Sequence, residues 1–187
     1  MIVNSKVLFD KCYGRYAIPA VNVFTMEQVL GLFKAGAHAN SPFLVQLTPV
    51  ARNYASPLMM MAMINAAAKT YPKAVYCVHL DHGDEAHAFD AIKSNEYQSV
   101  MIDASHDDFE NNIKRTSEVV QAAHKNGIFV EAELGVLSGV EDDISIDEKD
   151  SKYTKPSEVS EFVARTKCDS IAVAHEIIFV LRFSSVS

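Results

Sequence analysis

The sequence has little cysteine and lacks any long apolar run. Its three cysteines, Cys12, Cys77 and Cys168, are widely spaced and odd in number, which predicts free thiols in a reducing compartment and not a disulfide framework. The longest mainly apolar stretch, residues 57–68, is too short to span a bilayer. The first residues carry charges inside their apolar stretch and do not have the layout of a signal peptide. We therefore expect a cytoplasmic protein without a membrane partner.

Positive charge is also scarce. Seventeen Lys and Arg stand against 24 Asp and Glu, which gives a net charge of −7. Nucleic acids bind basic stripes, so no nucleic-acid partner is expected. The 187 residues are 49% hydrophobic and 22% charged, a composition typical of one globular domain with a sizeable core. No linker rich in Pro, Gly or Ser divides the chain, so a single domain is expected over residues 1–187.

Six short apolar runs alternate with amphipathic segments. The runs expected as strands are Ile18–Val23, Phe43–Leu47, Val75–Leu80, Ser99–Ile102, Ile128–Glu133 and Ser170–Ala174. The helices expected between them are Met26–His38, Pro57–Lys69, Asp84–Ser94, Phe109–Lys125 and Ser157–Thr166. Runs that are apolar throughout are typical of parallel strands covered on both faces. The alternation therefore predicts an α/β fold with a right-handed parallel sheet.

Two architectures fit this alternation, a doubly wound open sheet and a (β/α)8 TIM barrel. No GxGxxG or GxxxxGK[ST] motif follows a strand, which removes the main support for a nucleotide-binding open sheet. Polar residues gather instead at the carboxyl ends of successive strands, where barrel enzymes carry their catalytic groups. These residues are Asn22, Gln46, Thr48, Asp81, His82, Asp103, Glu131 and Glu133. A complete barrel needs about 250 residues, so we expect an incomplete one of about six strand–helix units.

The third and fifth expected strands carry the groups best suited to metal and acid–base chemistry. His79 and Asp81 share one strand face, and His82 follows where the chain turns into the next helix. A histidine beside a carboxylate suits a divalent metal next to an acid–base group, while a pair of hydrogen-bonded, half-buried histidines is the structural alternative. Glu131 and Glu133 are expected to point together into the interior, where buried carboxylates imply a cation or a basic partner.

A long loop is expected from Leu137 to about Tyr153, and long barrel loops are commonly lids or catalytic loops. Most of its acidic residues are expected to form a solvated face, with one in a chemical role.

Together these motifs resemble the zinc-dependent class II fructose-bisphosphate aldolases, including their tagatose-bisphosphate relatives. The similar segments, which follow family order and spacing, are Ile18–Val23, Met26–Gln28, His79–Gly83, Met101–His106, Val130–Gly135, Gly139–Asp142, Tyr153–Thr154 and Cys168–Ala174. The resemblance implies zinc-dependent, reversible cleavage of fructose 1,6-bisphosphate to dihydroxyacetone phosphate and glyceraldehyde 3-phosphate, in glycolysis and gluconeogenesis. It also implies phosphorylated ketose and triose substrates and a homodimer of the full-length protein.

The same resemblance implies roles for individual residues. His82 matches a ligand of the catalytic zinc, and Asp81 matches the acid/base that handles the proton of the C4 hydroxyl. Asp103 and Glu133 match an accessory site for a second divalent metal. Glu141 matches the loop carboxylate that exchanges the C1 proton of dihydroxyacetone phosphate.

Two further positions are implied as substrate-binding, Asn22 and Thr48, of which the second stands where the family usually has a serine. The other aldolase strategy is a Schiff-base lysine at the carboxyl end of a strand. Lys73 and Lys167 precede strands, and none of the other lysines falls at such an end. A metal mechanism is therefore favoured.

Residues 1–174 are family-like, and residues 175–187 form a divergent tail, as expected of a frameshift, an intron read-through or a wrongly assigned end. His175 lies too early to match the family's second zinc histidine. Since a catalytic zinc normally has three protein ligands, we expect the 187-residue chain to be inactive by itself. Three alternatives stay open: a tagatose-bisphosphate aldolase, a non-catalytic fragment that binds only metal or full-length subunits, and a metal-dependent hydrolase. The hydrolase would need an HxH-type ligand pair at the first strand, which Asn22 does not supply.

Overall fold

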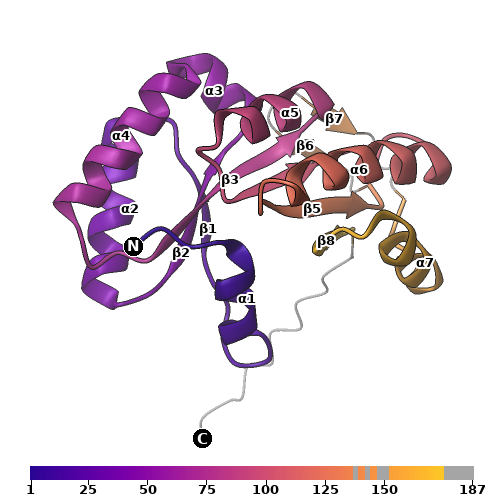
Figure 1. Cartoon of the computed structure of the whole chain (residues 1–187), viewed down its shortest axis with the longest axis horizontal. Coiled ribbons are helices and arrows are strands. Elements are labelled where there is room, and N and C mark those ends of the chain that lie inside the picture. Colours follow the sequence, from indigo (N-terminus) through magenta and orange to yellow (C-terminus); the bar gives the residue numbers. More distant parts are fainter. Residues whose placement is uncertain (137–138, 142–143, 147–151, 175–187) are drawn as a thin grey trace, which may run out of the picture.

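The computed structural model describes residues 1–136, 139–141, 144–146 and 152–174. Within this part of the chain, six parallel strands form a curled sheet in the order β1-β2-β3-β4-β5-β8, with helices outside it (Figure 1). The strands are β1 (Ala20–Asn22), β2 (Phe43–Leu47), β3 (Tyr76–Gly83), β4 (Ser99–Ile102), β5 (Phe129–Leu134) and β8 (Ser170–Val173). Each strand of the sheet pairs in parallel with the next one. The prediction of an incomplete TIM barrel is confirmed.

The helices include the five that the sequence predicts, with boundaries that differ by no more than one residue. They are α2 (Met26–Ala39), α4 (Pro57–Thr70), α5 (Glu85–Ser94), α6 (Phe109–His124) and α7 (Pro156–Thr166). The start of α5 differs because Asp84 is its N-cap, with a side chain that accepts a hydrogen bond from the His87 backbone N–H at 2.8 Å.

Two short helices were not predicted, α1 (Ser5–Cys12) and α3 (Pro49–Ala55). Each spans only about two turns, too few for a clear helical period in the hydropathy. Both begin at a capping side chain. Asn4 accepts from the Lys6 N–H at 2.9 Å, and Thr48 accepts from the Ala51 N–H at 3.2 Å.

The segment predicted as a loop contains an antiparallel pair, β6 (Gly139–Glu141) and β7 (Ile144–Ile146). The prediction of a loop throughout was therefore wrong. The alternation Ile-Ser-Ile in β7 is a strand signal, but it is too short to stand out within an acidic run.

The core lies between the outer face of the sheet and the helices. Phe33 of α2 is fully buried and packs edge-on against Phe43 and Tyr76, with ring centroids 5.2 Å and 4.7 Å away. Burying one such side chain stabilises the fold by about 1.5–3 kcal/mol. Because each strand pairs in parallel with the next one, the carboxyl ends of the strands meet at one rim.

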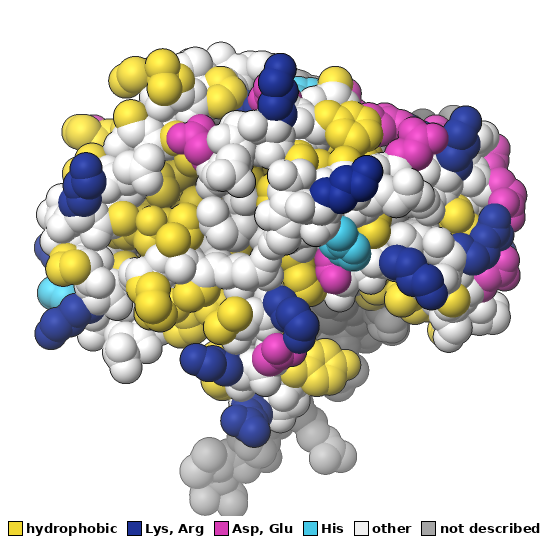
Figure 2. Space-filling model, viewed as in Figure 1, with side chains coloured by type: hydrophobic (Ala, Val, Ile, Leu, Met, Phe, Trp, Pro, Cys, Tyr) yellow, Lys and Arg dark blue, Asp and Glu magenta, His cyan; other side chains and the backbone are white. Residues whose placement is uncertain are grey.

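The types of side chain exposed at the surface differ between the two ends of the curled sheet. On the face shown in Figure 2, hydrophobic side chains gather over α2, β1 and β2, while charged ones are frequent over α6 and α7. Arg165 of α7 bonds both Glu110 of α6, at 2.8 Å, and Glu161, at 2.9 Å. No helix in the described part of the chain is long and apolar enough to cross a membrane.

Candidate metal and acid–base site

Three side chains from successive strands converge at the rim. His82 lies near the end of β3, Asp103 directly follows β4, and Glu133 belongs to β5. The Nδ1 atom of His82 is 3.0 Å from Asp103 Oδ2 and 3.5 Å from Glu133 Oε2. One ligand atom from each residue lies within 4.8 Å of the other two. An imidazole with two carboxylates is a donor set suited to a divalent metal.

An irregularity in β3 turns His82 toward its partners. The register between β3 and β4 shifts between Leu80 and Gly83, and His82 adopts a φ of +47°. This left-handed conformation costs a non-glycine residue about 1–3 kcal/mol. A Cβ at Gly83 would come within 2.6 Å of the Leu80 side chain and 3.2 Å of the Met101 carbonyl. The close approach at Gly83 lets the chain turn here, and it brings His82 beside Asp103.

The pKa values reflect this pairing. The hydrogen bond to Asp103 raises the pKa of His82 to about 9 against the opposing effect of burial, and Asp81 and Glu133 add to the rise. Burial alone would raise the pKa of Asp103, but hydrogen bonds from His82 and Ser105 lower it to about 2. Without a metal, the cluster therefore holds a positive charge on the imidazole. A bound cation would take over that charge.

Asp81 adds a carboxylate beside this cluster. It lies one residue before His82 and is nearly buried, with 8% of its surface exposed. Gln46 of β2 donates from Nε2 to Asp81 Oδ1 at 2.8 Å. Asp81 is therefore a nearly buried carboxyl group, oriented by an amide, beside a group of residues that could hold a metal ion.

A second polar cluster lies deeper inside the sheet. His79 is fully buried, with Nδ1 2.9 Å from Ser99 Oγ and Nε2 3.7 Å from Glu131 Oε2. Burial and the nearby charge of His82 lower the pKa of His79 to about 3, so its ring stays neutral. Burial and the charge of Asp81 raise the pKa of Glu131 to about 7. Its buried carboxyl group therefore binds a proton more tightly than an exposed one does. Glu131 does not belong to the group formed by His82, Asp103 and Glu133.

The remaining predicted positions lie apart from the three-residue cluster or outside the described side chains. Asn22 is exposed at the end of β1. Thr48 is 1% exposed and its hydroxyl caps α3. Glu141 ends β6, where only the backbone is described, and His175 lies outside the described residues.

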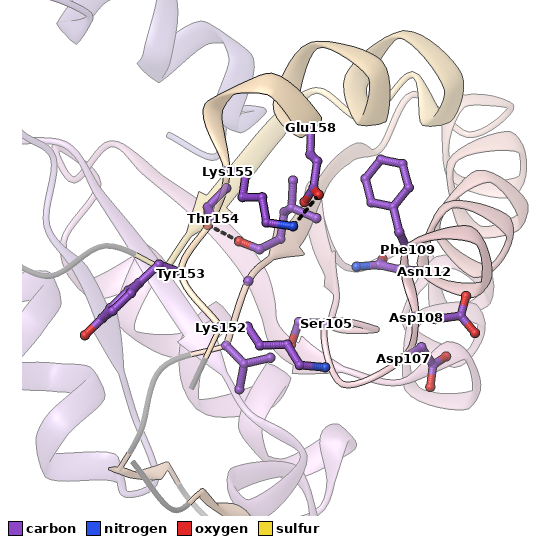
Figure 3. A pocket seen from close by; sticks show the side chains of 13 residues that line it. Ser105, Asp107, Asp108, Phe109, Asn112, Lys152, Tyr153, Thr154, Lys155 and Glu158 are labelled. Atoms are coloured by element: carbon purple, nitrogen blue, oxygen red, sulfur yellow. Dashed lines mark hydrogen bonds and ion pairs between the residues drawn. The ribbon is translucent and has the colours of Figure 1, made fainter. Parts of the chain in front are cut away.

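A cavity of about 360 Å³ lies between the carboxyl end of β5 and the first turns of α6 and α7 (Figure 3), and the three cluster residues are not among those that line it. Residues along its wall include Ser105, Phe109, Asn112, Leu134, Gly135 and Thr154. Ser105 bonds Asp103 Oδ1 through its N–H at 3.0 Å and its hydroxyl at 2.7 Å. Sequence reasoning assigned no role to Ser105 or Gln46, although both lie in or beside the strand-end motifs.

The sequence and structure are similar to those of known proteins. A family model described as "Fructose-bisphosphate aldolase class-II" matches residues 3–175. A fructose-bisphosphate aldolase of Helicobacter pylori is 37% identical over 174 residues, and one of Giardia intestinalis is 38% identical over 160 residues. These alignments cover 93% and 86% of the chain, but only 57% and 49% of the two relatives. The crystal structure of the YdjI aldolase from Escherichia coli K12 has a TM-score of 0.80 and 31% identity, over 93% of this chain and 62% of that one.

Proposed function

The chain belongs to the class II fructose-bisphosphate aldolase family, and from this premise we propose that its rim serves zinc-dependent, reversible cleavage of fructose 1,6-bisphosphate. The products are dihydroxyacetone phosphate and glyceraldehyde 3-phosphate. The observation that carries the proposal is the convergence of His82, Asp103 and Glu133 within 4.8 Å, each from a motif of the family resemblance. Because the chain spans 57% of the Helicobacter pylori relative, the proposal concerns the groups that this part of a barrel contributes.

The donor set fits Zn²⁺, which binds imidazole nitrogen and carboxylate oxygen in proteins. We assign His82 to the catalytic zinc, and Asp103 and Glu133 to an accessory divalent metal. This assignment is supported by the distances of 3.0 Å and 3.5 Å from the His82 Nδ1 atom to the Asp103 and Glu133 carboxylates. When bound, zinc supplies a Lewis acid that stabilises negative charge developing on substrate oxygens.

Asp81 is the proposed acid/base. In the cleavage direction it takes the proton from the C4 hydroxyl while the C3–C4 bond breaks and C4 becomes the aldehyde carbon. In the condensation direction it returns that proton. The hydrogen bond from Gln46 fixes one carboxyl oxygen, so the group is oriented before the substrate arrives. Glu141 is the proposed group that exchanges the C1 proton of dihydroxyacetone phosphate.

The same proposal covers the wider setting of the protein. Its substrates are phosphorylated ketoses and trioses, and Asn22 and Thr48 are the proposed substrate-binding residues. Its full-length form is a homodimer in the cytoplasm that acts in glycolysis and gluconeogenesis. The epimeric tagatose 1,6-bisphosphate is the alternative substrate.

The test uses two forms of the protein. In the first, the 187-residue chain is purified from a host that lacks its own class II enzyme and is assayed with added Zn²⁺. In the second, the part of the Helicobacter pylori relative beyond the matched region follows Ala174. We expect chelator-sensitive cleavage of fructose 1,6-bisphosphate only in the extended form. His82→Ala should remove both zinc and activity, and the exposed control His38→Ala should keep both.

Two results would contradict the proposal. One is an extended form that binds zinc but cleaves neither bisphosphate. The other is turnover by the 187-residue chain near the enzyme median of about 10 s⁻¹, which would mean that a complete zinc site exists without the family's other histidines.

A further inference from the structure

Thr154 lies where the carboxyl ends of β5 and β8 meet. Its hydroxyl donates to the Leu134 carbonyl and accepts a hydrogen bond from the Ala174 N–H at 2.8 Å. Its own N–H donates to the Ala174 carbonyl at 3.0 Å. The last paired residues of the two strands are Leu134 and Val173. The Ala174 N–H also reaches the Leu134 carbonyl directly, at 3.4 Å, so Thr154 reinforces a long bond between the strands just beyond their last paired residues.

The backbone around Thr154 is built for this close approach. Gly135 has a φ of +95°, and a Cβ there would come within 2.6 Å of Thr154 Oγ1 and 2.8 Å of the Ala174 Cβ. Val136 and Lys152 exchange two backbone hydrogen bonds of 2.7 Å, which close the base of the segment that carries β6 and β7. Figure 3 shows Thr154 at the wall of the cavity, bonded toward β5. A side chain at position 135 would displace the hydroxyl from the Leu134 carbonyl.

Glu133, the metal ligand in the proposed function, precedes Leu134 and is supported from the opposite side by α6. Asn112 is 2% exposed, and its Nδ2 donates to the Glu133 carbonyl at 2.9 Å. Asn112 Oδ1 in turn accepts from the Thr116 hydroxyl at 3.1 Å. Two successive carbonyls, those of Glu133 and Leu134, are thus each held by a side chain.

The hydrogen bonds of Thr154 lie at the end strand of the sheet. Within the described part of the chain, β8 is the end strand of the sheet and pairs only with β5. Its register with β5 spans four residue pairs, Glu131–Ser170 to Leu134–Val173, and Val173 is half exposed. The end of β5 would therefore fray more readily without the bonds of Thr154.

We propose that Thr154 is a positioning residue for the metal cluster. By locking β5 to β8, it keeps the Glu133 carboxylate beside Asp103, its partner in the accessory metal position, and 3.5 Å from the His82 Nδ1 atom. This inference rests on the proposed function, because it takes the three-residue cluster as a metal site. Groups that orient a metal ligand typically change metal affinity by about 10–100-fold when removed.

The test compares two substitutions at this position in the 187-residue chain. Thr154→Val keeps the shape and removes the hydroxyl, while Thr154→Ser keeps the hydroxyl. The matched control is Thr166→Val, because Thr166 Oγ1 also donates to a carbonyl, that of Phe162 at 2.8 Å, and accepts from an N–H, that of Cys168 at 3.2 Å. Zn²⁺ affinity is measured by competition with a chromophoric chelator, and backbone protection by hydrogen exchange of the Ala174 and Val136 amides.

We expect Thr154→Val to weaken Zn²⁺ binding by about 10–100-fold and to speed exchange at both amides. Thr154→Ser should restore both properties, and Thr166→Val should leave Zn²⁺ affinity unchanged. Gly135→Ala displaces the hydroxyl without removing it and should weaken binding in the same way, so it replaces Thr154→Val if that variant does not fold.

Wild-type Zn²⁺ affinity in Thr154→Val would overturn the positioning role, even if exchange becomes faster. Equal losses in Thr154→Ser and Thr154→Val would also overturn it, since the hydroxyl would then not matter. A wild-type 187-residue chain that binds no Zn²⁺ at all would overturn the positioning role, whereas the proposed function is judged separately, by the activity of the extended form.

Discussion

The outer face of the sheet is filled by apolar side chains, whereas the inner face carries imidazole, carboxylate and amide groups. In β2 and β3 the two faces alternate residue by residue. Val45, Val78 and Leu80 belong to the main hydrophobic core, while Gln46 and Asp81 meet on the other side. The outer face holds the strands together, and the inner face places charged groups that cost stability without partners. Substitutions on the two faces should therefore affect different properties.

The largest expected effect belongs to the inner face. In the extended form, Asp81→Ala should lower kcat by about 10²–10⁴-fold, the usual cost of losing a positioned proton-transfer group. Zinc content should stay near normal, because Asp81 is not one of the three proposed ligands. Steady-state kinetics with metal analysis checks this. If the variant lost zinc along with activity, Asp81 would be needed for zinc binding, and its proposed role in proton transfer would be contradicted.

On the outer face, Phe33→Ala should cost about 3–5 kcal/mol of unfolding free energy, since it leaves a cavity among buried aromatic rings. Zn²⁺ affinity of the folded fraction should not change. Urea denaturation and Zn²⁺ titration measure the two quantities, with Phe33→Leu as the milder control. If Zn²⁺ affinity fell by as much free energy as stability does, packing on the outer face would also determine metal binding on the inner face.

The dependence of stability on pH also distinguishes the two faces of the sheet, because the titrating residues His82 and Asp103 lie on the inner face. The pKa of His82 rises from 6.5 to about 9 on folding, so its stabilising effect is complete below pH 6.5 and is lost as pH rises through 9. The pKa of Asp103 falls from 3.8 to about 2, so its effect is present above pH 3.8 and is lost as pH falls through 2. Metal-free protein should therefore become less stable between pH 6.5 and 9. Denaturation midpoints with a chelator present should show this decline in the wild type and His38→Ala, and much less of it in His82→Ala.

The smallest expected effect lies on the outer surface. Asp84→Ala removes the N-cap of α5 and should cost about 1 kcal/mol. Asp84→Asn keeps an acceptor and should cost less. Thermal unfolding of the two variants measures the difference, and an equal loss in Asp84→Asn and Asp84→Ala would mean that the charge of Asp84, and not its capping hydrogen bond, matters there.

The sequence predicts the outer face better than the inner one, for physical reasons. β2 and β4 have the predicted boundaries, since buried apolar runs end where polar residues begin. β3 was expected to end at Leu80 but continues to Gly83, because its end is polar and contains a register shift. Hydropathy cannot indicate such a shift.

The candidate site shows the same limit. Parallel strands align their carboxyl ends, so the nearness of His82, Asp103 and Glu133 follows from strand order alone. The hydrogen bonds that hold the backbone around these residues cannot be deduced from strand order. Asn112 reaches Glu133 from a helix face, and Thr154 reaches Leu134 across 20 positions of the chain. Hydrogen bonds between distant residues depend on the folded geometry and leave no local pattern.

The central claim is that three side chains from three strands form one metal cluster. Zn²⁺ titration of the 187-residue chain tests it most directly, with the single variants His82→Ala, Asp103→Asn and Glu133→Gln. Glu131→Gln is the matched control, because it lies two residues before Glu133 on the same face of β5 but outside the cluster. Each of the three variants should bind Zn²⁺ at least about tenfold more weakly, the minimum that loss of even an orienting partner costs, while Glu131→Gln should bind it as the wild type does. Equal binding by all four variants, or an equal loss in Glu131→Gln, would contradict the claim.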